Sequence, residues 1–140
     1  MKKILLVAVL IAALGLTSCG SFEWEECVNA LDSVGYVIMQ DLHDPEKLVS
    51  TTNAFNNDVL YNGGDFKVKV TKYTHLIKGT DYSRNCQLIE FATKDQAKSY
   101  AEFYVETRAP LNTFKVGRQG NVVVLTNMSD AMEIAGLEFN

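Results

Sequence analysis

Residues 86–104 carry the sequence CQLIEFATKDQAKSYAEFY, in which a strand pattern changes to a helix pattern within a few residues. The first part, residues 86–92, is predicted as a strand centred on the apolar residues Leu88, Ile89 and Phe91. Thr93 and Gln96 then match the capping box, a signature of a helix N-terminus. Apolar side chains follow at helical spacing: Ala97, Tyr100, Ala101 and Tyr104. These patterns predict a β-strand followed directly by an amphipathic helix.

The same reasoning, applied outward from this stretch, predicts the other elements of the chain. Turn sequences at residues 62–65 and 78–81 separate several of them, and Asp44-Pro45 is typical of an N-cap followed by a first-turn proline. The remaining expected elements are helix 22–34, strand 36–39, helix 45–59, strand 66–77, strands 113–116 and 122–126, and a final helix capped by Ser129.

This order contains two strand–helix–strand segments, residues 36–78 and 84–126, with one further helix at each end. It resembles the split βαβ, ferredoxin-like arrangement, an antiparallel sheet with helices on one face. We therefore predict an α+β fold of two layers, with extra N- and C-terminal helices. A two-layer sandwich with another strand order is the alternative.

An export signal precedes this domain. Lys2 and Lys3 are followed by an apolar run, residues 4–16, that is too short to span a bilayer comfortably. Residues 16–19, Leu-Thr-Ser-Cys, then resemble the lipobox of bacterial lipoproteins. The resemblance implies cleavage before Cys19 and attachment of lipid to its sulfur. An ordinary secretory signal or an uncleaved anchor is the alternative.

The resemblance divides the chain into a signal peptide (1–18), a lipidated cysteine with a short tether (19–21) and one α+β domain (22–140). It implies an extracytoplasmic protein anchored to the cell membrane or the outer membrane. Without Lys2 and Lys3 the chain keeps 11 basic and 17 acidic residues, a net charge of −6. An acidic domain is repelled by polyphosphates, so nucleic-acid binding is not expected.

Lipidation of Cys19 leaves two of the three cysteines, Cys27 and Cys86. Outside the cytoplasm two leftover thiols often form a disulfide. Cys27 lies on the apolar face of the first expected helix, and Cys86 begins a strand that this helix could cover. Two buried, unpaired cysteines that act as small hydrophobic residues are the alternative.

Asp41 and His43 belong to the chain's only carboxylate–imidazole cluster, together with Asp44. If the strand before them continued, Asp41 and His43 would share a face and could bind a divalent metal. The helix cap already explains Asp44, and His75 is distant in sequence, so we predict no metal site and no cofactor. These two residues are the only weak candidates.

No motif for catalysis is found in the sequence. Phe103 lies off the main apolar face of its helix. Phe103 is therefore a candidate surface for a partner, such as an envelope protein. In layout the chain resembles small envelope lipoproteins of unassigned role. The expected function is a non-enzymatic binding or scaffolding module tethered to a membrane. The alternatives are an envelope hydrolase or metal-dependent enzyme, built on His43 or His75, and an inhibitor or immunity-type protein.

Overall fold

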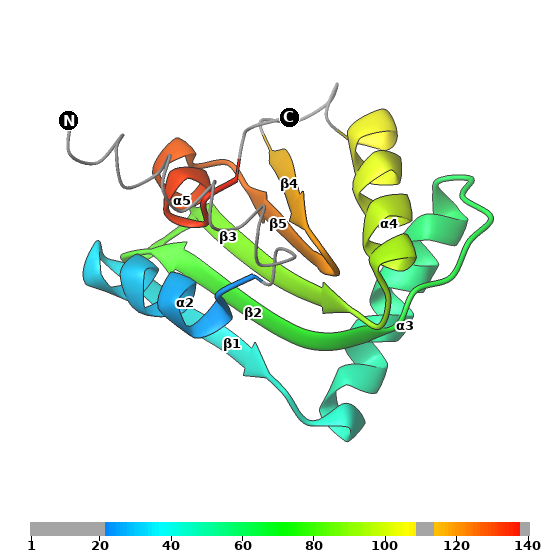
Figure 1. Cartoon of the computed structure of the whole chain (residues 1–140), viewed down its shortest axis with the longest axis horizontal. Helices are drawn as coiled ribbons and strands as arrows, with labels where there is room; N and C mark the ends of the chain where they lie inside the picture. The colour runs from blue at the N-terminus through cyan, green and yellow to red at the C-terminus, as the bar shows by residue number, and fades with distance from the viewer. Residues whose placement is uncertain (1–21, 109–113, 138–140) are drawn as a thin grey trace.

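The computed structural model describes residues 22–108 and 114–137, and within these ranges four helices pack on a five-stranded sheet (Figure 1). The elements, in chain order, are α2 (Trp24–Ser33), β1 (Tyr36–Leu42), α3 (Pro45–Tyr61), β2 (Val70–Lys78), β3 (Asp81–Phe91), α4 (Lys94–Thr107), β4 (Lys115–Gln119), β5 (Val122–Thr126) and α5 (Ser129–Ile134). The strand order is β1-β2-β3-β5-β4, and every neighbouring pair is antiparallel. The predicted α+β class with an antiparallel sheet is confirmed.

Helices cover both faces of the sheet, so the predicted two-layer arrangement is wrong. Side chains alternate along β3: Ile89 and Phe91 belong to a core cluster with α3 and α4, whereas Cys86 and Leu88 belong to a second cluster with α2 and α5. The sheet therefore lies between two helical layers (Figure 1). The sequence patterns identified each helix and strand, but they contain no information on which face each helix covers.

The strand order also differs from the predicted ferredoxin-like topology. In a split βαβ unit, the two strands joined by a helix are parallel and have another strand between them. Here β1 and β2, which α3 connects, are direct antiparallel neighbours. The β4–β5 hairpin then adds to β3 through its second strand, β5, which leaves β4 at the edge.

Strand β2 begins at Val70 rather than at Phe66, because helix side chains bind the preceding backbone. The Asn56 side chain in α3 accepts from the Val68 N–H at 2.8 Å and donates to the Val68 carbonyl at 2.9 Å. Thr52 accepts from the Val70 N–H at 3.0 Å. The Thr and Asn side chains of α3 thus hold the connecting segment in place.

Of the three predicted N-caps, those at Asp44 and Thr93 are confirmed and that at Ser129 is wrong, because Ser129 is already the first residue of α5 and the N-cap, Met128, makes no side-chain capping hydrogen bond. Asp44 accepts from the Glu46 N–H at 3.0 Å, and Thr93 accepts from the Gln96 N–H at 3.1 Å. The capping box is incomplete, however, because the Gln96 side chain accepts from the Lys69 N–H at 2.8 Å instead of returning to its own helix. This contact joins the start of α4 to the segment before β2.

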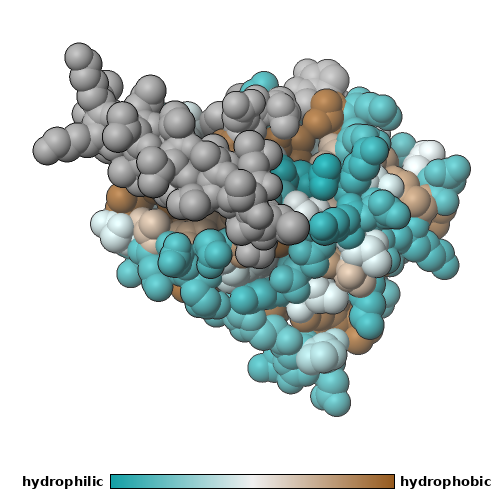
Figure 2. Space-filling view, in the orientation of Figure 1, coloured by the Kyte–Doolittle hydropathy of each residue, from teal (hydrophilic) through white to brown (hydrophobic). Residues whose placement is uncertain are grey.

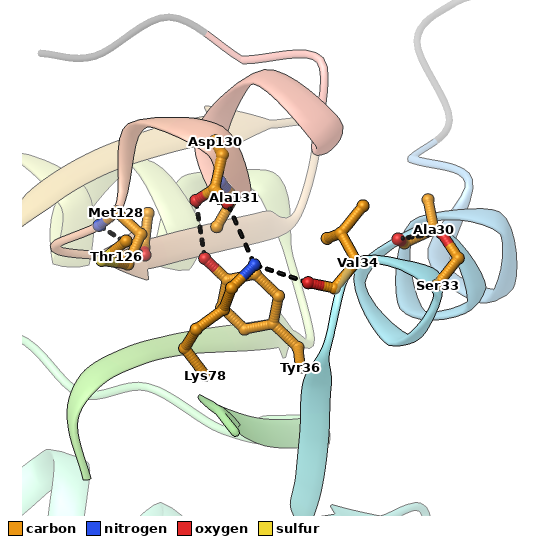
Figure 3. Close-up of polar contacts among 9 residues, drawn as sticks. All are labelled: Ala30, Ser33, Val34, Tyr36, Lys78, Thr126, Met128, Asp130 and Ala131. Atoms are coloured by element: carbon orange, nitrogen blue, oxygen red, sulfur yellow. Dashed lines mark hydrogen bonds and ion pairs between the residues drawn. The ribbon is translucent and has the colours of Figure 1, made fainter. Parts of the chain in front are cut away.

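A polar cluster joins the α2–β1 turn to α5 (Figure 3). The buried Tyr36 donates its hydroxyl proton to Asp130 at 2.7 Å. Lys78 lies 4.7 Å from the centre of the Tyr36 ring, and its ammonium donates to the Val34 carbonyl at 2.5 Å and to Asp130 at 3.4 Å. Partial burial tends to raise the pKa of Asp130, but the hydrogen bonds from Tyr36 and Ala131 and the Lys78 charge outweigh it and hold the pKa below its usual value.

This cluster predicts a contribution to acid stability. Because the pKa of Asp130 is lowered in the folded state, its stabilising effect is complete above the pKa of the unfolded chain and is lost as the pH falls through the folded pKa. We expect Asp130→Asn to lower the stability at neutral pH and to flatten the loss of stability below about pH 4. Urea unfolding across a pH series measures this. The exposed Asp32→Asn serves as control, and an unchanged acid profile for Asp130→Asn would refute the prediction.

Candidate ligand-binding groove

A groove of about 450 Å³ lies over the sheet between α3 and α4. Its floor comes from the sheet and its walls from the two helices, so residues far apart in the sequence meet there. The lining residues are Gln40, Ser50, Thr51, Ala54, Phe55, Asp58, Tyr73, Gln87, Tyr100, Tyr104, Arg108 and Leu125. The volume is within the range of small-molecule sites, roughly 300–1,000 Å³.

The floor carries a polar row that crosses three strands. Gln40 of β1 is paired in register with His75 of β2, and His75 is paired with Gln87 of β3. The polar row ends there, because the next residue in register, Leu125 of β5, is apolar and buried. Residues that face one another across strands share a face of the sheet, so two amides and an imidazole lie together on the α3–α4 side.

Tyr73 orients one of these amides. Its hydroxyl donates to the Gln87 Oε1 atom at 2.8 Å, and burial raises the pKa of Tyr73 to about 12, so the hydroxyl keeps its proton. With its carbonyl oxygen occupied, Gln87 has its –NH₂ group left to donate. Burial lowers the pKa of His75, which favours a neutral imidazole with one donor and one acceptor.

An ion pair closes one end of the groove. Arg108, the C-cap of α4, contacts the Asp58 carboxylate of α3. Tyr100 donates to the same carboxylate at 3.5 Å, and Asn62 donates to it at 3.0 Å. The two charged side chains of the lining therefore neutralise each other.

The structure brings Asp41 and His43 together, but away from the polar row. His43 Nε2 lies 2.6 Å from Asp41 Oδ1, and both side chains are almost half exposed. Asp41 also accepts from the Thr74 hydroxyl at 2.9 Å. Asp41 is paired with Thr74 and Gln40 with His75, so alternation places Asp41 and His75 on opposite faces of the sheet. Within the described part of the chain, no group of three His, Cys, Asp or Glu residues could hold a metal ion.

Cys27 and Cys86 lie in the same core cluster, between α2 and β3, and each is a free thiol. They are 5% and 0% exposed. The first helix therefore covers the strand at Cys86, as predicted, and brings the two cysteines into one core. Their oxidation to a disulfide stays a prediction. Cys19 lies outside the described residues.

Phe103 does not form the predicted partner surface, because its side chain is buried at 7% exposure. It packs edge-on against Phe66, with the ring centres 5.7 Å apart. The segment before β2 thus covers a second side of α4, which the helical pattern alone did not indicate. Among the coloured residues of the face shown in Figure 2, hydrophilic ones predominate.

Sequence reasoning missed the groove, although one signal was present. Gln87 occupies an inward position in strand β3, on the same face as Ile89 and Phe91. A polar residue at such a position needs a partner or a ligand. The partner, Tyr73, and the wall residues of α3 and α4 become neighbours only in the folded chain.

Comparison with known proteins adds no relative. No protein-family model, curated protein or solved structure matches this chain. The function is therefore inferred from the chain's own residues.

Proposed function

We propose that this protein is an exported lipoprotein, held to a membrane through lipid on Cys19, whose domain is a non-enzymatic binding module. Positive charge, apolar run, small residues and cysteine follow one another in residues 1–19, and this order supports the anchor. The observation that carries the binding role is the α3–α4 groove with its polar floor. Among the residues that the structure describes, no helix is long and apolar enough to cross a membrane.

The arrangement of the polar groups supports binding over hydrolysis. A hydrolase built on His43 or His75 needs the imidazole beside carboxylates in a cleft. His43 has Asp41 as its partner at a half-exposed position, and His75 lies in register between two glutamines. The carboxylate of the groove, Asp58, is already engaged by Arg108.

The domain is expected to lie close to its membrane. Phe22 already packs against the core beside Trp24, with the ring centres 6.1 Å apart. Only residues 20 and 21 separate Phe22 from Cys19, so an extended tether reaches about 10 Å. We therefore expect the ligand or partner to be found at the envelope.

Substitution of Cys19 tests the anchor. We expect Cys19→Ala to leave an unprocessed precursor or to release the protein from the membrane, because the acceptor sulfur for lipid is lost. Membrane fractionation and intact-protein mass spectrometry measure location, cleavage and added lipid mass. Cys27→Ala is the matched control and should stay processed and membrane-bound. A Cys19→Ala chain that remains cleaved and fully membrane-bound would refute lipidation.

Co-purification tests the binding role. Small molecules released from the protein after purification from its native envelope are compared between the wild type and Gln87→Leu. We expect at least one compound to be enriched on the wild type and depleted on Gln87→Leu. The control variant, Gln119→Leu, alters a glutamine on β4 that is outside the groove. Identical compounds on all three proteins would contradict a ligand site at Gln87.

A further inference from the structure

We propose that the α3–α4 groove binds a neutral saccharide of one or two rings, an inference that rests on the proposed binding function. The chemistry of the lining selects this class, as the charge, the hydrogen-bonding groups and the apolar surface each show.

Charge favours a neutral ligand. Asp58 and Arg108 are the only Asp, Glu, Lys or Arg side chains among the twelve lining residues, and they bind each other. The neutral His75 of the neighbouring floor adds no charge. An anion would have to compete with Asp58 for Arg108 and approach a chain whose net charge without the signal peptide is −6, whereas a cation would have to displace Arg108 from Asp58.

The hydrogen-bonding groups match hydroxyls. A sugar hydroxyl both donates and accepts, so its site needs donors and acceptors close together. The amides of Gln40 and Gln87 and the hydroxyls of Ser50 and Thr51 supply both, on opposite sides of the groove. The orientation of Gln87 by Tyr73 prepares its –NH₂ group to donate before any ligand arrives.

Apolar surface lies beside these polar groups. Ala54 and the partly buried Phe55 of α3 line the groove, and the Phe55 ring contacts those of Tyr73 and Tyr100 at centre distances of 6.2 and 5.0 Å. These edge-on contacts hold the ring in place. This fixed apolar surface lies on the same helix as the Ser50 and Thr51 hydroxyls and opposite the floor amides. Such a mixture suits a sugar ring, which carries C–H groups on its faces and hydroxyls around its edge.

Saturation-transfer NMR on the full-length protein tests the proposal. The protein is extracted in a zwitterionic detergent without a sugar headgroup, because a glycoside detergent would compete for the groove. The probes are maltose, cellobiose, lactose and N,N′-diacetylchitobiose, with galacturonic acid and glucosamine as charged counterparts. We expect saturation transfer to at least one neutral probe and weaker transfer to the charged ones.

Variants of the two groove glutamines test whether the saccharide binds in the groove. Gln40→Leu and Gln87→Leu each remove one amide, and we expect each to weaken binding about three- to tenfold. Gln40 is exposed, so Gln40→Leu should fold normally even if Gln87→Leu does not. Gln119→Leu is the matched control on β4 and should bind as the wild type does.

The outcomes separate this inference from the proposed function. No transfer to any neutral probe at about 10 mM, stronger binding of a charged probe, or unchanged binding in Gln40→Leu overturns the saccharide assignment. If the saccharides fail while another compound co-purifies through Gln87, the binding module stands with a different ligand. If neither occurs, both proposals fall, and the anchor is still decided by Cys19→Ala.

Discussion

Phe91→Ala is expected to lower the free energy of unfolding by about 3–5 kcal/mol. Phe91 is the last residue of β3 and is 0% exposed. Its ring lies 6.0 Å from the Phe55 ring of α3 and 5.4 Å from the Tyr100 ring of α4, measured between centres. Alanine would leave a cavity where the sheet meets both helices of this layer, and the surrounding rings would relax only in part.

Urea unfolding followed by circular dichroism measures this loss. The control is Tyr61→Ala at the end of α3, because Tyr61 is 90% exposed and its truncation should change the stability by less than about 0.5 kcal/mol. Equal losses for the two variants would show that Phe91 is not at the centre of this core. Because Phe91 and Tyr100 support the wall of the groove, the variant should also lose ligand binding.

Native Cys27 and Cys86, in their reduced form, are expected to be alkylated at least about a thousandfold more slowly than in the unfolded chain. Burial raises the pKa of the Cys27 thiol to about 12 and also raises that of Cys86, with the nearby Cys27 as a second cause. The reactive thiolate is therefore scarce at pH 8, and both sulfurs are shielded from the reagent. The time course of maleimide labelling, followed by mass spectrometry, measures the rate.

Labelling after unfolding without reductant then reports the oxidation state. With Cys19 acylated, two labels would show that both thiols are free in the exported protein, as they are in the structure. No label would show that the exported protein carries the predicted Cys27–Cys86 disulfide. A third label would show that Cys19 has no lipid. Fast labelling of the native protein would contradict the burial of the pair.

Much of the local structure could be predicted because its causes are local. The caps at Asp44 and Thr93 depend on a side chain two or three residues from the N–H that it binds. The apolar run that predicted β5 depends on neighbouring residues in the same way. Strand β2 started later than predicted because its first N–H groups bind α3, which lies far away in sequence.

The candidate site was much less predictable. Asp41 and His43 could be predicted as a pair because they are two residues apart where β1 ends. The groove joins Gln40, Gln87 and Asp58, which come from β1, β3 and α3. No spacing along the chain relates these residues, since the register between strands and the placement of the helices bring them together. Phe103 was misassigned for the same reason, because Phe66 covers it from another segment.

The sequence by itself determined the α+β class, most of the helices and strands, and the acidic charge. It also predicts the export signal of residues 1–19. All of these depend on composition or on contacts between close neighbours in the chain. Only the tertiary structure decided that helices cover both faces of the sheet, that β1 and β2 are antiparallel neighbours, and that a polar row lies under α3 and α4. Packing between distant segments sets these features, because an amphipathic helix or an alternating strand buries its apolar face equally well in several arrangements.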